Sequence, residues 1–291
     1  MARRHAASDL SRMLKRIAFF GYGVVCYAVF FATFLYAIGF IGGFLVPTTL
    51  DGAATVPLAK GIAIDAGLLG LFAVQHSVMA RRWFKERWTR IVPPALERST
   101  YVLLSSVALI LLFRLWRPLG GVVWSVHDPI GRAVLLALFA FGWTLVLVST
   151  FLINHFDLFG LRQVWLFLRG KPYTPLTFGT PGPYRLVRHP LYVGWFFAFW
   201  MTPTMTYAHL LFAVATAGYI LIAIQFEERD LVHFHGRTYE EYRQRVPMLI
   251  PFVRRSASSR QKLQRAGAAV VALMLVKGLV WLAIGAAVLR K

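Results

Sequence analysis

Of the 291 residues in the chain, 58% are hydrophobic and only 15% are charged, far below the roughly 25% charged residues of a soluble domain. The net charge of +20 is concentrated in short segments that border apolar runs, as membrane orientation requires, so nucleic-acid binding is not expected. The single cysteine, Cys26, excludes an internal disulfide and a cysteine metal cluster. The composition therefore predicts a polytopic membrane protein.

The first part of the chain predicts a basic N-terminal segment followed by two membrane spans. Residues 1–16 carry five bases against Asp9 and predict a cytoplasmic segment. Residues 17–46 form an apolar run that is too long for a cleavable signal and long enough to cross a bilayer. A second span, residues 61–80, ends in polar groups, and a basic segment containing tryptophans follows it.

Two further spans and a long connection come next. Residues 99–116 and about 133–156 have the length and apolarity of spans. Residues 160–188 then contain five bases and no acids. Four glycines and four prolines between residues 160 and 183 disfavour a regular element. We expect this connection to be cytoplasmic and to fold over a site as a cap.

An apolar excursion follows, with polar groups at both of its ends. Residues 191–201 and 206–226 predict two helical arms, of which the first is too short for a full crossing. Pro190 suits the first turn of the first arm, where its missing N–H costs nothing. Such a hairpin of uneven depth returns to the side from which it came, so the polar groups at its two ends can meet.

The C-terminal part predicts one amphipathic helix and one ambiguous apolar run. Thr238-x-x-Glu241 is a capping-box pattern, and it predicts a helix with Tyr239 and Tyr242 on one face. Residues 267–289 are apolar, but Lys277 near their middle costs about 2.5–3.5 kcal/mol on insertion. This run crosses the membrane, lies in its interface, or has no defined role.

These elements predict an all-α, polytopic integral-membrane helical bundle with about five spans, a C-terminal apolar segment and a cytoplasmic cofactor site. The basic clusters all fall on one side of this arrangement, which is the cytoplasmic side in a bacterial inner membrane. The predicted division of the chain is a basic lead (1–16), N-terminal spans on the substrate side (17–160), a core with hairpin and cap (161–253), and a basic linker with the extra apolar segment (254–291).

The core carries a recognisable pattern. Arg188-His189-Pro190-x-Tyr192-x-Gly194, then Glu227-Glu228, then Gly236-x-x-Tyr239-x-x-Tyr242 resembles the C-terminal core of a membrane methyltransferase superfamily. Isoprenylcysteine carboxyl methyltransferases and phospholipid N-methyltransferases belong to it, and all use S-adenosylmethionine. The stretches 75–81 and 154–163 are similar to those of the bacterial methanethiol S-methyltransferases. The resemblance covers roughly residues 10–253.

The resemblance implies an S-adenosylmethionine site between the two ends of the hairpin. Glu227 and Glu228 are expected to bind hydroxyls or positive charge. The carboxylate of the cofactor is expected to accept hydrogen bonds from Arg185, Arg188 and His189. Its adenine is expected to pack against Tyr184, Tyr192 and Tyr239. The predicted cofactor residues are Tyr184, Arg185, Arg188, His189, Pro190, Tyr192, Gly194, Glu227, Glu228 and Tyr239.

The same resemblance implies a small volatile thiol as the substrate. Methanethiol offers only a thiol and a methyl group, so recognition requires a small apolar cavity and a group that favours the nucleophilic thiolate. The candidates are His76, His155 and Asp157, with Gln75 and Asn154 as hydrogen-bonding neighbours, and the sequence does not rank them. No metal site is predicted, because the His233-x-His235 pair has no clear acidic partners. His235 also stands where the superfamily usually has Phe.

Two alternatives remain open. A relative in the same superfamily would methylate a lipidic substrate, such as a prenyl-cysteine carboxylate or an amine headgroup, through an opening to the bilayer. A non-catalytic membrane accessory protein would keep the helices without needing the cofactor. A transporter is disfavoured because the sequence shows no internal repeat of broken helices.

Overall fold

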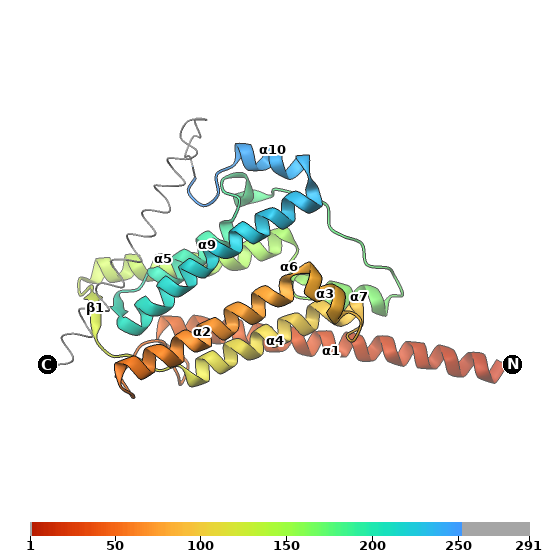
Figure 1. The fold of residues 1–291 in the computed structure, drawn as a ribbon, viewed down its shortest axis with the longest axis horizontal. Coiled ribbons are helices and arrows are strands. Elements are labelled where there is room, and N and C mark those ends of the chain that lie inside the picture. Colours follow the sequence, from red (N-terminus) through yellow and green to blue (C-terminus); the bar gives the residue numbers. More distant parts are fainter. Residues whose placement is uncertain (1, 252–291) are drawn as a thin grey trace.

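The computed structural model describes residues 2–251, and the predicted linker and apolar segment at 254–291 lie outside them. The regular elements of the described part are almost all helices (Figure 1). Its elements are α1 (Ala2–Gly42), α2 (Leu58–Ala80), α3 (Arg82–Trp88), α4 (Pro94–Leu115), β1 (Val122–Ser125), α5 (Pro129–Ile153), α6 (His155–Leu158), α7 (Leu161–Leu168), the 3₁₀ turn Gly182–Arg185, α8 (Pro190–Trp200), β2 (Thr204–Thr206), α9 (Tyr207–His235) and α10 (Arg237–Arg245).

Within residues 2–251, five helices are long and apolar enough to cross a membrane. They are α1 from Ala7 onward, α2, α4, α5 and α9. This confirms the predicted all-α polytopic bundle and its number of spans. The predicted uneven hairpin is also present, because α8 has 11 residues whereas α9 has 29.

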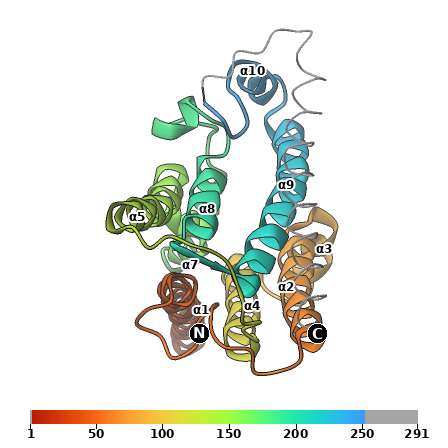
Figure 2. The ribbon, with the colours of Figure 1, turned by 90° about the vertical axis from the view of Figure 1, so that its left-hand side faces the viewer.

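The long helices lie in two layers. Seen along the bundle, α1, α4 and α2 form one layer, and α5, α8 and α9 lie over it, with α10 beyond α8 and α9 (Figure 2). The short helices α3, α6 and α7 lie at one end of the bundle, which we call the α3 end (Figure 1). β1 lies at the opposite end, where it pairs antiparallel with β2.

Two polar contacts fix that opposite end. His209 is fully buried in the first turn of α9, and its Nδ1 lies 3.1 Å from a carboxylate oxygen of Asp51. Thr206 caps α9 by accepting from the His209 backbone N–H, and its hydroxyl also bonds Asp51. Asp51 belongs to the connection between α1 and α2, so these bonds tie that connection to the start of α9.

The close packing of α5 against α8 requires glycine. A Cβ placed on Gly194 would lie 2.8 Å from the carbonyl oxygen of Gly142, and a Cβ on Gly142 would lie 2.6 Å from the Ala198 nitrogen. The two backbones therefore touch, and no side chain fits between them. Gly194 was predicted to be a cofactor residue, and the neighbour that it meets in the structure is α5.

Three predicted boundaries were wrong. The connection after the fourth span is partly regular, because residues 161–168 form α7, whose Val164 packs against Gly23 of α1. The fourth helix starts at Pro129, where Asp128 caps it, and it ends at Asn154, whose φ of 101° is left-handed. The second arm does not end at Phe226. It continues as α9 to His235, because its polar turns pack against α2 through an Arg81–Asp230 ion pair.

The start of the last helix also differs from the prediction. α10 begins at Arg237, and Gly236 with a φ of 51° is its N-cap. Thr238 therefore lies inside the first turn and does not cap it. Glu241 pairs with Arg237 at 2.8 Å instead of closing a capping box. The predicted face is confirmed, since Tyr239 and Tyr242 are both buried.

Candidate functional site

The two ends of the hairpin meet in a buried ion pair. Arg188 precedes α8, and its Nε lies 2.6 Å from Glu228 Oε1 on α9. His189 Nε2 lies 3.1 Å from the same oxygen. Arg188 also donates to the carbonyls of Arg243 and Val246, at 3.1 and 2.7 Å. The Glu228 carboxylate is thus held from two sides, and Arg188 joins α8, α9 and the end of α10.

Glu227 has a different environment from its neighbour. Its Oε2 accepts a hydrogen bond of 2.8 Å from the Tyr192 hydroxyl, and His189 Nδ1 lies 3.9 Å away. The Glu227 side chain is 45% exposed, against 12% for Glu228. Among residues 2–251, no hydrogen bond to its Oε1 is seen. Glu227 is therefore the carboxylate of this cluster that remains open to a ligand.

Aromatic side chains cover the same cluster. Phe178 comes from the irregular residues 171–181, and its ring lies 5.7 Å from Tyr239, 5.4 Å from Tyr242 and 5.1 Å from His235. The Tyr242 hydroxyl donates to the Tyr184 carbonyl at 2.6 Å. The predicted cap thus contacts α10 through Phe178. The hydrogen bond between Tyr242 and Tyr184 holds the 3₁₀ turn at the end of the cap against α10.

The tyrosine hydroxyls among these aromatic side chains are neutral, and one of them lacks a hydrogen-bond partner within the described residues. Burial raises the pKa of Tyr242 to about 12, and it also raises the pKa of Tyr184 and of Tyr239 above the usual value near 10. Tyr239 is 1% exposed, yet its hydroxyl has no hydrogen-bond partner within the described residues. A buried donor without a partner is costly, so this hydroxyl is suited to a ligand. Arg185, by contrast, is exposed to solvent.

The motif at the end of α2 faces the same region. His76 lies 2.9 Å from the Tyr101 hydroxyl and 3.2 Å from Ser105 Oγ, both on α4. Ser77 Oγ lies 3.2 Å from the Tyr219 hydroxyl of α9. Tyr219 lies on the same helix as Glu227, about two turns before it. The α2 motif therefore contacts α9 on the turns that precede the cluster. Gln75 turns back along its own helix, and its amide donates to Met79 Sδ at 3.1 Å.

His155 is enclosed by aromatic rings. It is 2% exposed and stacks on Phe151 at 4.2 Å. Its Nδ1 lies 2.8 Å from Thr150 Oγ1 and its Nε2 lies 2.8 Å from the Tyr27 hydroxyl of α1. Burial lowers the pKa of His155 below its usual 6.5, so the imidazole is neutral at pH 7.

The other two residues of this motif shape the turn. Asn154 Oδ1 accepts from the Asp157 backbone N–H at 3.0 Å and caps α6. The Asp157 carboxylate pairs with Arg162 at 2.8 Å and accepts from the Tyr173 hydroxyl at 3.3 Å. Asp157 therefore anchors the beginning of the cap.

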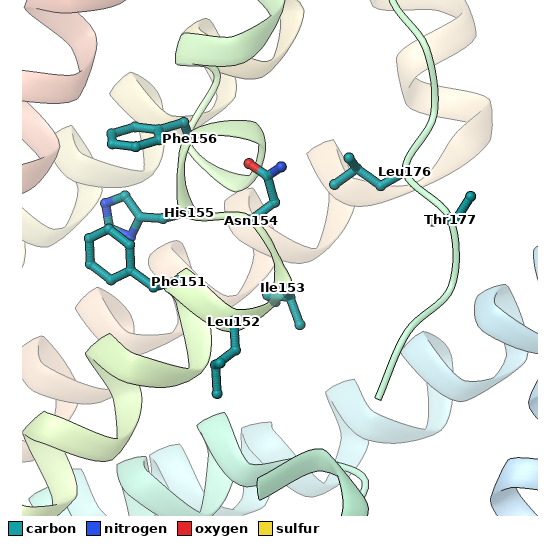
Figure 3. Close-up of a pocket in the computed structure, with 8 residues that line it drawn as sticks. All are labelled: Phe151, Leu152, Ile153, Asn154, His155, Phe156, Leu176 and Thr177. Atoms are coloured by element: carbon teal, nitrogen blue, oxygen red, sulfur yellow. The ribbon is translucent and has the colours of Figure 1, made fainter. Parts of the chain in front are cut away.

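A pocket of about 440 Å³ lies between the α5–α6 junction and the cap (Figure 3). Leu176 of the cap lies across it from Asn154, whereas the His155 ring is turned away beside Phe151. Leu152, on its wall, packs against Gly182 at the start of the 3₁₀ turn that carries Tyr184. The residues that line it are Phe151, Leu152, Ile153, Asn154, His155, Phe156, Leu176 and Thr177.

Sequence reasoning missed four residues of this site: Tyr27, Tyr101, Phe178 and Tyr219. The three tyrosines sit inside apolar runs, and their partners lie 25 to 142 residues away in the sequence. No local pattern signals such contacts. No group of three or more metal-ligating side chains is found in the part of the chain that the structure describes.

Comparison with known proteins gives three informative relatives. A methanethiol S-methyltransferase of Crocosphaera subtropica is 59% identical over 232 residues, which is 80% of this chain and 91% of the relative. One of Mycobacterium tuberculosis is 55% identical over 242 residues, 83% of this chain and 99% of the relative. Nurim of Bos taurus is 34% identical over 196 residues, 64% of this chain and 72% of nurim. No family model matches the chain. No solved structure matches it either.

Proposed function

This chain belongs to the methanethiol S-methyltransferase family, and we propose that it transfers a methyl group from S-adenosylmethionine to methanethiol at a membrane. The products are dimethyl sulfide and S-adenosylhomocysteine. The names of relatives at 48–59% identity support the reaction. The observation that carries the proposal is the meeting of Arg188, His189 and Tyr192 with Glu227 and Glu228 at the open end of the hairpin.

The residues of this cluster fit the proposed cofactor. S-adenosylmethionine supplies an electrophilic methyl group on a sulfonium when it is bound. Within the described residues, Glu227 has an oxygen free for the hydroxyls or positive charge of such a molecule, and the Tyr239 hydroxyl is an unpartnered buried donor in the aromatic cover of the cluster. Arg185 is exposed and available for a carboxylate. Arg188, His189 and Glu228 are bonded to one another, so their role is to hold the walls of the site in place.

We assign thiol orientation to His76. Asp157 is occupied by Arg162 and Tyr173, and the His155 ring is sealed among aromatic rings. His76, by contrast, precedes Ser77, which contacts Tyr219 on the helix that carries Glu227. General-base assistance is worth about 10²–10⁴-fold in rate. His76→Ala should therefore lose that much turnover, and part of it should return at alkaline pH, where more thiol ionises unaided. Full turnover of this variant at neutral pH refutes the assignment.

We further propose that the α3 end faces the cytoplasm in the inner membrane. α3 and the residues beside it carry Arg81, Arg82, Lys85, Arg87 and Arg90. Such a basic cluster beside a span is retained on the cytoplasmic side. The cofactor, which is made and kept in the cytoplasm, then has direct access to Glu227, and the apolar thiol reaches the site without leaving the membrane region.

The experiment is a substrate comparison on the purified chain in lipid nanodiscs. Methanethiol, a prenyl-cysteine and an amine-headgroup lipid are each supplied with S-adenosylmethionine, and the methylated products are identified by mass spectrometry. We expect dimethyl sulfide from methanethiol and no product from the other two. A methylated lipid would favour the lipidic alternative, and failure to bind S-adenosylhomocysteine would favour an accessory protein.

A further inference from the structure

The first helix is much longer than a membrane span. α1 contains 41 residues, which corresponds to roughly 60 Å of helix, about twice the hydrocarbon thickness of a bilayer. Its N-terminal part runs past the α3 end and projects clear of every other labelled element (Figure 1). From Ala7 to Lys15, all side chains except Ser8 are exposed. The bundle itself does not explain why this part of the helix keeps exposed apolar residues such as Leu10 and Leu14.

An apolar seam with a seven-residue repeat runs along α1, from its projecting part into the part that packs in the bundle. Its alternating spacing of three and four residues is the spacing of the a and d positions of a coiled coil. Every residue of the seam is exposed. The a positions are Ala7, Leu14, Gly21, Ala28 and Leu35, and the d positions are Leu10, Ile17, Val24 and Phe31.

The charges of the projecting part lie away from this seam. Asp9, Arg12, Lys15 and Arg16 occupy the b, c and f positions, and the e and g positions beside the seam hold Ser11 and Met13. Asp9 and Arg12 approach each other at 3.9 Å along the outer face. A surface that faces lipid needs apolar residues, but these need not recur every 3.5 residues. A surface that packs against a partner helix needs apolar residues with that period. The pattern therefore fits another helix better than it fits lipid.

Gly21 lies on the seam and is compatible with a partner there. A Cβ on Gly21 would meet nothing within 4 Å, as is also true of Gly67, Gly70 and Gly218, whereas a Cβ on Gly23 would lie 2.5 Å from Val164. A small residue on an exposed helix face permits a second helix to approach closely.

We propose that the seam of α1 is a dimer interface, and that its occupant is α1 of a second copy of this chain in parallel orientation. Parallel pairing about an axis normal to the membrane lets both copies keep the same orientation in the bilayer. The six large seam residues expose 40–56% of their surface. At roughly 150–200 Å² for a large apolar side chain, the pair buries about 1,000 Å² in total, the lower limit of a specific interface.

The first test uses the open space at Gly21. Gly21→Leu adds bulk that only a partner can meet, and Gly70→Leu in α2 is the matched control, since a Cβ there also meets nothing. The mass of each variant is measured in nanodiscs and in detergent over a range of dilutions. We expect dimers for the parent chain and for Gly70→Leu, and a dissociation constant raised at least tenfold for Gly21→Leu, or about 1.4 kcal/mol. A monomeric parent chain overturns the proposal.

The second test reads the register directly. Single cysteines are placed at Leu14 in the seam and at Arg12 outside it, in a Cys26→Ala background, and disulfide formation is induced in membranes. Parallel pairing brings the two Leu14 positions together, so Leu14→Cys should cross-link and Arg12→Cys should not. Equal cross-linking of both variants would show random collision and refute the seam, whether or not the chain methylates a thiol.

Discussion

Glu227 and Glu228 are neighbours in α9, but their carboxylates have different partners. Glu228 is bonded to Arg188 and His189, both of which are 5% exposed or less. Glu227 is half-exposed, and within the described residues its one hydrogen bond comes from Tyr192. A buried charge that loses its partner is costly, whereas an exposed one is stabilised by water. We therefore propose that Glu228 stabilises the site and that Glu227 meets the ligand.

Replacing each glutamate by glutamine separates these roles. Glu227→Gln should weaken binding of S-adenosylhomocysteine about ten- to a hundred-fold, as expected for a lost bond to a charged group, with little change in thermal stability. Glu228→Gln should lower the free energy of unfolding by about 1.5–3 kcal/mol, because it leaves Arg188 short of its partner. Calorimetry and thermal unfolding measure the two effects. Equal affinity in the parent and Glu227→Gln proteins would contradict the assignment.

His155 gives a prediction about pH. Because burial lowers its pKa, the folded protein binds fewer protons at this site than the unfolded chain does between the folded value and 6.5. Stability should therefore fall as pH decreases below about 6.5, and His155→Gln should lose this part of the pH dependence. Apparent melting temperatures from pH 7.5 to 5 measure the difference between the two proteins. Parallel pH curves for parent and variant would show that His155 does not contribute.

At the scale of elements, the contact of α5 with α8 positions the start of the hairpin. α8 begins directly after Arg188 and His189, so the crossing at Gly142 and Gly194 sets where those side chains lie. Gly194→Ala should destabilise the protein by about 1–3 kcal/mol, since the added methyl would lie 2.8 Å from a backbone oxygen. Gly218→Ala in α9 is the control, because a Cβ there meets nothing. Unfolding by denaturant compares them, and an equally stable Gly194→Ala protein would contradict the close contact.

The sequence predicted the spans and the hairpin well because apolar length and period are local signals. It placed the end of α9 too early, because Phe226 is followed by polar residues that leave the apolar pattern but continue the helix against α2. α7 was missed for a similar reason: its eight residues are too few for a clear period between glycines and prolines. Of the predicted cofactor residues, Arg188, His189, Tyr192, Glu227 and Glu228 meet in space, whereas Gly194 packs against α5. The roles that we propose within this cluster depend on burial, which no motif encodes.

For the whole molecule, the orientation that we propose rests on the distribution of basic residues. Residues 45–57 and 117–128 lie at the end opposite α3, and they contain few bases. Single cysteines at Thr49, Ser125 and Thr238 in a Cys26→Ala background report this orientation. An impermeant thiol reagent added to intact cells should label the first two and not the third. Labelling at Thr238, or none at Thr49 and Ser125, would reverse the orientation.

The measurement that tests the central claim most directly follows the methyl group itself. Purified protein receives methanethiol and S-adenosylmethionine with a deuterated methyl group, and the headspace gas and the solution are assayed together. We expect singly labelled dimethyl sulfide and S-adenosylhomocysteine in equal amounts, with both strongly reduced in Glu227→Gln. Dimethyl sulfide without the label, or no dimethyl sulfide from protein that binds the cofactor, would contradict the proposed reaction.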